Sequence, residues 1–362
     1  MKVPFLDLRI KNPEKKILIK SLNKIMDHGI FVMGPEIKKF EDKISKICNR
    51  KYCISVGSGT EAIYLALKSL KLNIGDEVIT TSLSWIATAN AIKLNNLKPV
   101  FADIDEDLNI SPKSIKKLIT KKTKAILIVN YTGKICNLEE IKKICKKKKL
   151  YLLEDCAQSF GAIKNNKISG SNGVISTFSF NPMKIFGGLG ESGAILTNNF
   201  SLYKKLLFLR YNGTINRETL VEPSLNCRMD TIQAGFLIDR LKKVKKIIKN
   251  RNANARIYQK YLKDLVIVPD IDEGETHCFY TFTIICNKRD SLRKFLSKKN
   301  VETQIQHPIL MPLQKPYLNC KKDIINSKKI VKKILSIPIH ENLSNNQIMY
   351  VINSIKKFYE HN

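Results

Sequence analysis

Short apolar, often β-branched runs alternate with amphipathic helical segments along most of the chain, and this alternation limits the fold more than any other feature. The predicted strands are residues 53–56, 77–80, 99–102, 125–129, 151–154, 174–180 and 194–197. Helical spacing between most of them, as in residues 61–70, 86–94 and 138–148, predicts an α/β domain with a mostly parallel sheet flanked by helices. Residues 194–197 follow too closely for a crossover helix, which favours an antiparallel neighbour.

Both ends of the chain depart from this alternation. Residues 13–27 and 35–47 are expected to form two helices, and Lys-rich helices are predicted at 230–250 and 251–262. A smaller α+β region follows, with a strand at 276–284 and helices at 291–299 and 344–359. We therefore predict a large domain over residues 1–235 and a small C-terminal domain over 236–362, with the N-terminal segment assigned to either.

Composition excludes several classes of protein. No apolar run reaches the length of a membrane span, and the N-terminus has no signal-peptide core, so we expect no membrane association. The nine cysteines are scattered without a Cys-x-x-Cys pair, which favours reduced thiols in the cytosol over disulfides or zinc. The five histidines also lack ligand spacing, so no metal site is predicted.

The formal net charge of +31 suggests a nucleic-acid-binding protein as one alternative. However, the short lysine runs at 146–149 and 242–249 fall on helical segments rich in Ile and Leu. No helix-turn-helix, RRM or zinc-finger pattern accompanies them. Solvated helix faces therefore explain the charge better, and no specific nucleic-acid partner is expected.

Lys184 differs from all the other lysines in the residues that surround it in the sequence. Lys184 follows the predicted strand 174–180 and Pro182, and Gly187, Gly188 and Gly190 come soon after it. A lysine that forms an imine needs its amine held in one place and partly desolvated, with small residues leaving room for a flat cofactor. An ordinary strand and turn carrying a solvated lysine explains this stretch equally well.

Residues 56–62, Val-Gly-Ser-Gly-Thr-Glu-Ala, follow a strand and open a helix. Glycines allow close backbone approach there, and the free N–H groups of a helix N-terminus bind phosphate. A weak dinucleotide-binding fingerprint, with Asp76 or Glu77 as the ribose acid, is a second interpretation. An ordinary strand-to-helix turn is the third.

Two further motifs end predicted strands. Asp155 lies at the carboxyl end of a strand, where α/β sheets bind ligands; it could pair with a protonated ring nitrogen, and Gln158 could reach the same ring. The alternative is an Asp that caps the next helix, and Glu154 is the weaker candidate because it points to the opposite face. Trp85, the only tryptophan, could stack on a heteroaromatic ring or belong to the core.

Four features follow one another along the chain: a turn that can bind phosphate, a flat aromatic ring, an Asp at the end of a strand, and a lysine between a proline and several glycines. Together, in this order, they fit pyridoxal 5'-phosphate (PLP). With these motifs, and with segments 3–8, 34–41, 75–89, 99–105, 154–161, 179–193 and 226–230, nearly the whole chain resembles the DegT/DnrJ/EryC1/StrS family. These are sugar aminotransferases of the fold-type I PLP enzymes, so the resemblance implies that fold, a mixed and mostly parallel sheet in the large domain.

The resemblance implies a role for each matching residue. Lys184 would hold the cofactor covalently and move protons, and Asp155 would pair with the pyridinium nitrogen. Gln158 would bond the ring hydroxyl, Trp85 would stack on the ring, and Gly59, Thr60 and Ser179 would hold the phosphate. Asn226 would reach that phosphate from the neighbouring subunit of a homodimer. The candidates for substrate binding are Arg228, Arg210 and His307.

The implied activity is transfer of an amino group, with L-glutamate as donor, to a nucleotide-linked keto-deoxysugar, in amino-sugar biosynthesis for surface polysaccharide or glycoconjugate. Segment 185–191 is closer to that of relatives acting at C3 of the sugar than at C4. The family's dehydratase branch has a histidine in place of Lys184, so transamination is expected. Asn130, Asn181 and Ser192 depart from the commoner family pattern on the substrate side. A nicotinamide-dependent Rossmann dehydrogenase remains an alternative.

Overall fold

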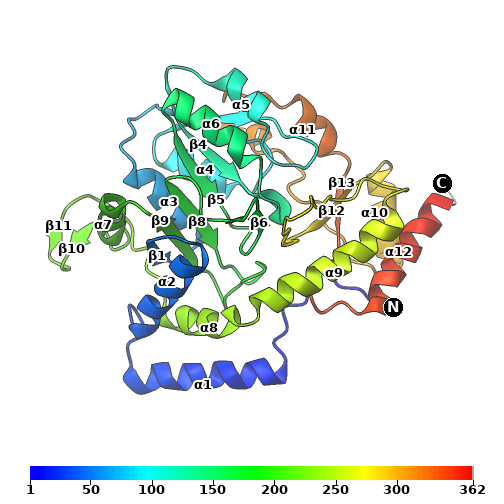
Figure 1. Cartoon of the computed structure of the whole chain (residues 1–362), viewed down its shortest axis with the longest axis horizontal. Helices are drawn as coiled ribbons and strands as arrows, with labels where there is room; N and C mark the ends of the chain where they lie inside the picture. The colour runs from blue at the N-terminus through cyan, green and yellow to red at the C-terminus, as the bar shows by residue number, and fades with distance from the viewer. Residues whose placement is uncertain (361–362) are drawn as a thin grey trace.

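Seven strands form one central sheet in the computed structural model, which describes residues 1–360 (Figure 1). They are β1 (Tyr52–Val56), β2 (Glu77–Thr81), β3 (Lys98–Ala102), β4 (Thr123–Val129), β5 (Tyr151–Asp155), β8 (Ile175–Ser179) and β9 (Gly193–Thr197), in the spatial order β1-β9-β8-β5-β4-β2-β3. Neighbours from β8 to β3 are parallel. β9 runs antiparallel to both β8 and β1, which confirms the expectation for this strand.

Helices cover both faces of the sheet, because each carries apolar residues at helical spacing. One face is covered by α2 (Pro35–Ile47), α5 (Pro112–Leu118), α6 (Leu138–Lys148) and α8 (Thr231–Leu241). The other is covered by α3 (Gly59–Ser69), α4 (Ala87–Leu94) and α7 (Phe200–Leu209). The first helix, α1 (Asn12–His28), lies along α8 at the outside of the molecule (Figure 1). The predicted α/β fold with a mostly parallel sheet is confirmed.

The strand directions bring distant parts of the sequence to one edge of the sheet. β5 ends there at Asp155 and β8 at Ser179. Since β1 is parallel to β8, the start of α3 at Gly59 reaches the same edge. The segment after β2, which carries Trp85, also begins there. The edge is therefore the place where a ligand can meet all four.

A second hydrophobic core lies in the C-terminal part of the chain. It is formed by β12 (Phe282–Ile285) and β13 (Ile334–Ile337), which pair antiparallel, with the second half of α9 (Val244–Leu262), α10 (Arg289–Lys298) and α12 (Asn345–Glu360). Val3 belongs to this core and pairs with Val301, and we therefore propose that the N-terminal segment is part of the small domain.

Helix α9 connects the two cores. Its residues Val244 and Ile248 pack into the large core, whereas Ala255 and Leu262 pack into the small one. We therefore propose that the domain boundary falls within α9 rather than at residue 235. Residues 361–362, at the end of the predicted small domain, lie outside the described residues. The short elements are β6 (Ile163–Lys164), β7 (Lys167–Ile168), β10 (Thr214–Ile215), β11 (Thr219–Leu220), α11 (Ile325–Ile330) and the 3-10 turns Tyr131–Gly133, Met311–Leu313 and Lys315–Tyr317.

Two predicted elements differ from the structure. The helix predicted at 230–250 ends at Leu241, and α9 begins at Val244; no Gly or Pro marks this break, so the apolar pattern ran across it. The strand predicted at 276–284 begins only at Phe282. Residues 276–281 alternate like a strand, but the N–H groups of Cys278 and Thr281 bond to the loop after β4, and Thr276 forms only an isolated bridge with Ile163.

Within residues 1–360, no helix is long and apolar enough to cross a membrane. All nine cysteines are free thiols, and eight of them are buried. In the same described part of the chain, no three His, Cys, Asp or Glu side chains are grouped so that they could hold a metal ion.

Candidate active site

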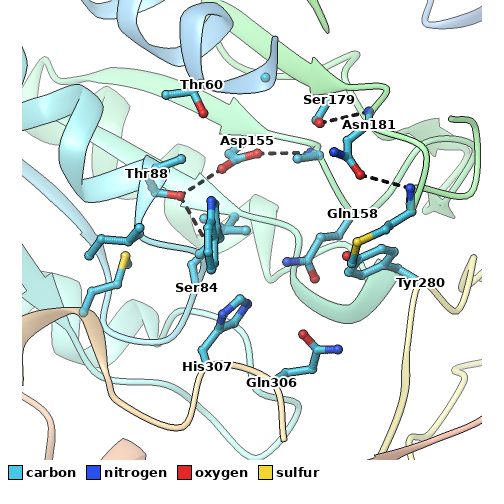
Figure 2. Close-up of a pocket in the computed structure, with 18 of the residues that line it drawn as sticks. Thr60, Ser84, Thr88, Asp155, Gln158, Ser179, Asn181, Tyr280, Gln306 and His307 are labelled. Atoms are coloured by element: carbon cyan, nitrogen blue, oxygen red, sulfur yellow. Dashed lines mark hydrogen bonds between the residues drawn. The ribbon is translucent and has the colours of Figure 1, made fainter. Parts of the chain in front are cut away.

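A cavity of about 710 Å³ opens at the carboxyl edge of the sheet, where Tyr280 and residues 304–309 close its other side (Figure 2). Its wall contains most of the predicted site residues: Gly59, Thr60, Trp85, Asp155, Gln158, Ser179, Lys184 and His307. In Figure 2, Thr60 and Ser179 lie on one side of Asp155, and His307 and Gln306 lie on the other. The cavity therefore has a side near the start of α3 and a side near the loop that carries His307.

The start of α3 forms a cradle with the end of β8. Ser58 caps the helix, since its Oγ accepts a hydrogen bond of 3.1 Å from the backbone N–H of Glu61. The N–H groups of Gly59 and Thr60 have no acceptor within the helix, as in any first turn. A Cβ on Gly59 would lie 2.5 Å from Cβ of Ser179, so only glycine allows this approach. Two N–H groups and two hydroxyls thus converge where a phosphate can bind.

Asp155 is buried at the centre of the cavity wall. Its Oδ2 accepts a hydrogen bond from Oγ1 of Thr88 (3.1 Å), and its Oδ1 accepts one from the N–H of Ala157 (3.1 Å). Burial raises the pKa of this carboxyl, while the Ala157 N–H, the charge of Lys184 and the Thr88 hydroxyl lower it. Turns rather than a helix follow β5, so the helix-cap interpretation does not apply. A buried carboxylate with a raised pKa would be stabilised by a cationic ring nitrogen.

Gln158 and Trp85 flank this carboxylate. Oε1 of Gln158 accepts a 2.8 Å hydrogen bond from the N–H of Thr132, which leaves the amide NH₂ as the group available to a ring hydroxyl. Trp85 is 62% exposed, so it is not a core residue. Its ring centre lies 5.9 Å from that of His307 at the cavity wall. An exposed indole here offers a flat face to a heteroaromatic ring.

Lys184 is held by the turn that follows β8. Its backbone N–H donates to the carbonyl of Asn181 (2.8 Å). A Cβ on Gly187 would lie 2.7 Å from the carbonyl oxygens of Asn181 and Pro182, so the glycine is needed for the turn to close. The Lys184 amine reaches the cavity, where Nζ lies 3.5 Å from the hydroxyl of Tyr280.

Loop residues form the other side of the cavity. His307 is half-buried beside Trp85 and Tyr131, and burial, with the charge of Lys184 adding to it, lowers its pKa to about 4. Nδ2 of Asn181 donates to Oε1 of Glu191 at 2.5 Å. This side is therefore neutral or acidic at neutral pH, apart from Lys184 itself.

Three predicted residues lie outside the cavity wall of this chain. Arg210 is buried, where it donates to Oε1 of Glu41 (2.7 Å) and to Ser55. Its expected role in substrate binding is therefore corrected: this pair satisfies a buried charge instead. Asn226 is exposed, and its Oδ1 accepts a hydrogen bond from Nε of Arg228 (2.9 Å), whose guanidinium lies 4.0 Å above the ring of Tyr211.

Sequence reasoning missed Tyr280 and the loop with Gln304, Gln306 and Gln314, all of which line the cavity. Nothing in the sequence marks them, because their positions depend on how the small domain meets the sheet. Glu154 is fully buried beneath the site and accepts hydrogen bonds from the N–H of Asn172 (2.8 Å) and other donors. It supports the loop after β5 rather than facing a ligand.

The residues present fit PLP. The cradle that a Cβ on Gly59 would fill suits its phosphate, and the desolvated carboxylate of Asp155 suits its ring nitrogen. Trp85 offers an exposed flat face, and the amine of Lys184 reaches the same cavity. The arrangement can thus hold a phosphorylated aromatic aldehyde beside one reactive lysine.

Comparisons with known proteins agree with this geometry. The sequence model of the "DegT/DnrJ/EryC1/StrS aminotransferase family" matches residues 13–356. The chain is 34% identical to a "pleiotropic regulatory protein" of Geobacillus stearothermophilus over the full length of both chains. It is 33% identical to the dTDP-3-amino-3,6-dideoxy-alpha-D-galactopyranose transaminase of Aneurinibacillus thermoaerophilus, over 98% of this chain and 99% of that protein.

Among solved structures, the S. venezuelae protein DesV superposes with a TM-score of 0.95 at 28% identity, covering 99% of each chain. The resemblance inferred from the motifs is thereby confirmed, and the dehydrogenase and nucleic-acid alternatives lose their support. The chain belongs to the DegT/DnrJ/EryC1/StrS aminotransferase family and is a PLP-dependent aminotransferase.

Proposed function

We propose that this protein transfers an amino group from L-glutamate to a keto group of a nucleotide-linked deoxysugar, at C3 rather than C4, in amino-sugar biosynthesis. The observation that carries the proposal is the convergence of Lys184, Asp155, Trp85 and the start of α3 on one cavity. The free thiols of all nine cysteines support a cytosolic setting for the reaction.

Each of these residues has a task in the proposed reaction. Bound PLP supplies an electron sink for the charge left on a carbon that loses its proton. Asp155 keeps the ring nitrogen protonated, and the cradle at Gly59, Thr60 and Ser179 fixes the phosphate. Lys184 would move a proton between the substrate carbon and the reacting carbon of the cofactor: away from the donor's carbon in the first half of the reaction, and onto the sugar's carbon in the second.

The charge around the cavity favours a site completed by a second subunit. Among residues 1–360, Lys184 is the one Lys or Arg that lines the cavity, and Asp155 and Glu191 add negative charge. A cofactor phosphate and a sugar diphosphate would bring several more negative charges, which need cationic or N–H partners. Arg228 and Asn226 lie together on the surface and carry such groups.

The surface around these two residues supports the same arrangement. Leu220, Val221 and Leu225, in the segment just before Asn226, are 60%, 49% and 55% exposed. Apolar side chains grouped in this way are typical of an interface. We propose a two-fold homodimer in which Asn226 and Arg228 of one subunit serve the cavity of the other.

The choice of C3 is based on the segment after Lys184. Residues 185–191 resemble the form found in relatives acting at C3, and the name of the Aneurinibacillus relative places its amino group at C3. This segment includes Glu191 at the cavity wall, so its shape can decide which ring carbon comes within about 3–3.5 Å of the reacting atom.

Paired assays test the proposal. The holoenzyme is given glutamate with 3-keto or 4-keto nucleotide sugars, and the aminated product is measured. We expect turnover of at least one 3-keto compound and at least about tenfold less with its 4-keto isomer. Turnover of 4-keto compounds alone would contradict the position, and no turnover of either class would contradict the substrate class.

A further inference from the structure

A segment of the small domain crosses to the cavity and is bonded there to the large domain. We call residues 276–281 the strap. Thr276 exchanges two hydrogen bonds with Ile163 (3.0 and 2.8 Å), and Cys278 N–H donates to the carbonyl of Gly133 (3.1 Å). Thr281 N–H donates to the carbonyl of Thr132 at 3.3 Å. The strap is therefore held by one bridge to β6 at its start and by the loop after β4 along the rest, instead of forming a strand of a sheet.

The strap contains a strained residue at its middle. Phe279 has φ +49°, a left-handed conformation that is rare and costly for a bulky side chain. Its N–H donates to Nδ1 of His277 at 2.9 Å, and the two rings stack with centres 4.0 Å apart. Burial lowers the pKa of His277 to about 3, so Nδ1 remains an acceptor at neutral pH.

The surroundings hold this kink in place. Gly133, itself at φ +103°, lies so close that a Cβ there would be 2.8 Å from Sγ of Cys278 and 2.9 Å from N of Tyr280. Nη1 of Arg251 donates to the carbonyl of Phe279 at 2.8 Å. Strain that is held by so many contacts is typical of a functional site rather than of a connecting loop.

The kink directs the next side chain into the cavity (Figure 2). The hydroxyl of Tyr280 lies 3.5 Å from Nζ of Lys184, and the same Nζ lies 4.5 Å from the centre of its ring. In the described chain, no other hydrogen-bond partner of Nζ is within reach. Tyr280 thus presents both an oxygen and a ring face to one amine.

We propose that Tyr280 is a positioning residue for Lys184. Its ring and hydroxyl keep the amine at the cavity wall whenever the amine is not bonded to the cofactor, and the strained strap serves to aim it. The inference rests on the proposed role of Lys184 in proton transfer. A ring face and a hydroxyl oxygen stabilise a protonated amine, so Tyr280 also helps Lys184 to keep a proton between its two transfers.

Competitive labelling tests the contact directly. The full-length protein without cofactor is labelled with acetic anhydride across a pH series, and the rate at each lysine is read by peptide mapping. We expect the midpoint of the Lys184 labelling curve to move to lower pH by about 0.5–1 unit in Tyr280→Leu. Tyr280→Phe, which keeps the ring, should move it by less than half as much.

The control is Tyr261→Leu, because the ring of Tyr261 also lies near lysines, 5.4 Å from Nζ of Lys260 and 5.2 Å from Nζ of Lys356. It should leave the Lys184 curve unchanged. The labelling rate at high pH reports access to Lys184, so only the midpoint measures the contact. An unchanged midpoint in folded Tyr280→Leu overturns the proposal; if that variant does not fold, an unchanged midpoint in Tyr280→Met, which also removes the ring and the hydroxyl, does so.

Kinetics give a second readout on the holoenzyme. Tyr280→Leu should lower kcat about tenfold with glutamate and change KM less than about twofold, since the contact acts on proton transfer. A rise in KM alone would contradict a positioning role. A shifted midpoint together with a cofactor adduct on a different lysine would keep the contact but refute the proposed function of Lys184.

Discussion

The two sides of the cavity are built differently. Asp155 and Ser179 end strands of the sheet, and Thr60 starts a helix, so their positions follow from the fold itself. His307 and Asn181 lie on loops and are only partly buried. Rigid elements therefore hold the side suited to the cofactor, while loops form the side proposed to meet the substrate. The difference indicates that strands and helices hold the residues suited to the cofactor, whereas the loops determine which substrate is accepted.

The largest expected effect is at Lys184. Lys184→Ala should lower kcat at least about a thousandfold, because the residue that moves the proton is lost. Binding of pyridoxamine phosphate should change little, since the phosphate and ring contacts remain. Lys204→Ala is the matched control, because Lys204 also lies above an aromatic ring, that of Phe200, but on the surface. Equal losses in the two variants would remove the distinction between Lys184 and other lysines.

A smaller effect is expected at Asp155, where a substitution should change cofactor binding and the stability of the cofactor-free protein in opposite directions. Asp155→Asn should weaken cofactor binding about a hundredfold, because a charged hydrogen bond to the ring nitrogen is lost. The exposed Asp264→Asn should have no such effect. Equilibrium titration with PLP measures both.

Stability without cofactor should change in the opposite direction. Burial raises the pKa of Asp155, so as pH rises above about 3.9 the unfolded chain loses this proton first and the folded state is destabilised. Asn carries no such penalty, so cofactor-free Asp155→Asn should melt higher than the wild type at pH 7, with a gap that closes toward about pH 4. Saturating PLP should reverse the order. The same order with and without PLP would contradict the proposed pairing.

Subunit mixing tests whether the substrate side is shared. Asn226→Asp places a carboxylate opposite the cofactor phosphate and should lower activity at least about tenfold. After exchange with inactive Lys184→Ala, heterodimers should each hold one intact site and restore about a quarter of wild-type activity. No recovery, with exchange confirmed by mass spectrometry, would mean that each chain completes its own site.

The smallest expected effect is at His307. His307→Asn keeps a residue type that tolerates the φ of +51° and should raise KM for the keto sugar about threefold, with KM for glutamate unchanged. His28→Asn, at the end of α1, is the control. Because the pKa of His307 is lowered to about 4, it stays neutral above about pH 5.5 and should add no inflection near 6.5. An inflection there that His307→Asn removes would contradict its neutral state.

The sequence predicted the cofactor side well because each of its residues belongs to a local motif. Lys184, Asp155 and the cradle at Gly59 are each marked by a strand end, a turn or a glycine, and parallel strands necessarily bring such ends together. The strands of the sheet were found for the same reason, apart from one or two residues at their ends.

The rest depends on contacts between distant segments. Tyr280 lies in a stretch that alternates like a strand, and the bonds of that stretch to the loop after β4 and to Arg251 turn it toward Lys184. Arg210 has the charge expected of a phosphate ligand, but it forms a buried ion pair with Glu41, which is distant in the sequence. Neither contact can be predicted from the residues next to it in the sequence.

The most direct test of the central claim is to locate the cofactor on the chain. The purified holoenzyme should absorb visible light, and borohydride reduction followed by peptide mapping should find the cofactor attached to Lys184. Omitting borohydride is the control, because the bond should then be lost on denaturation. An adduct on another lysine, or a protein that takes up no PLP, would contradict the account of this site.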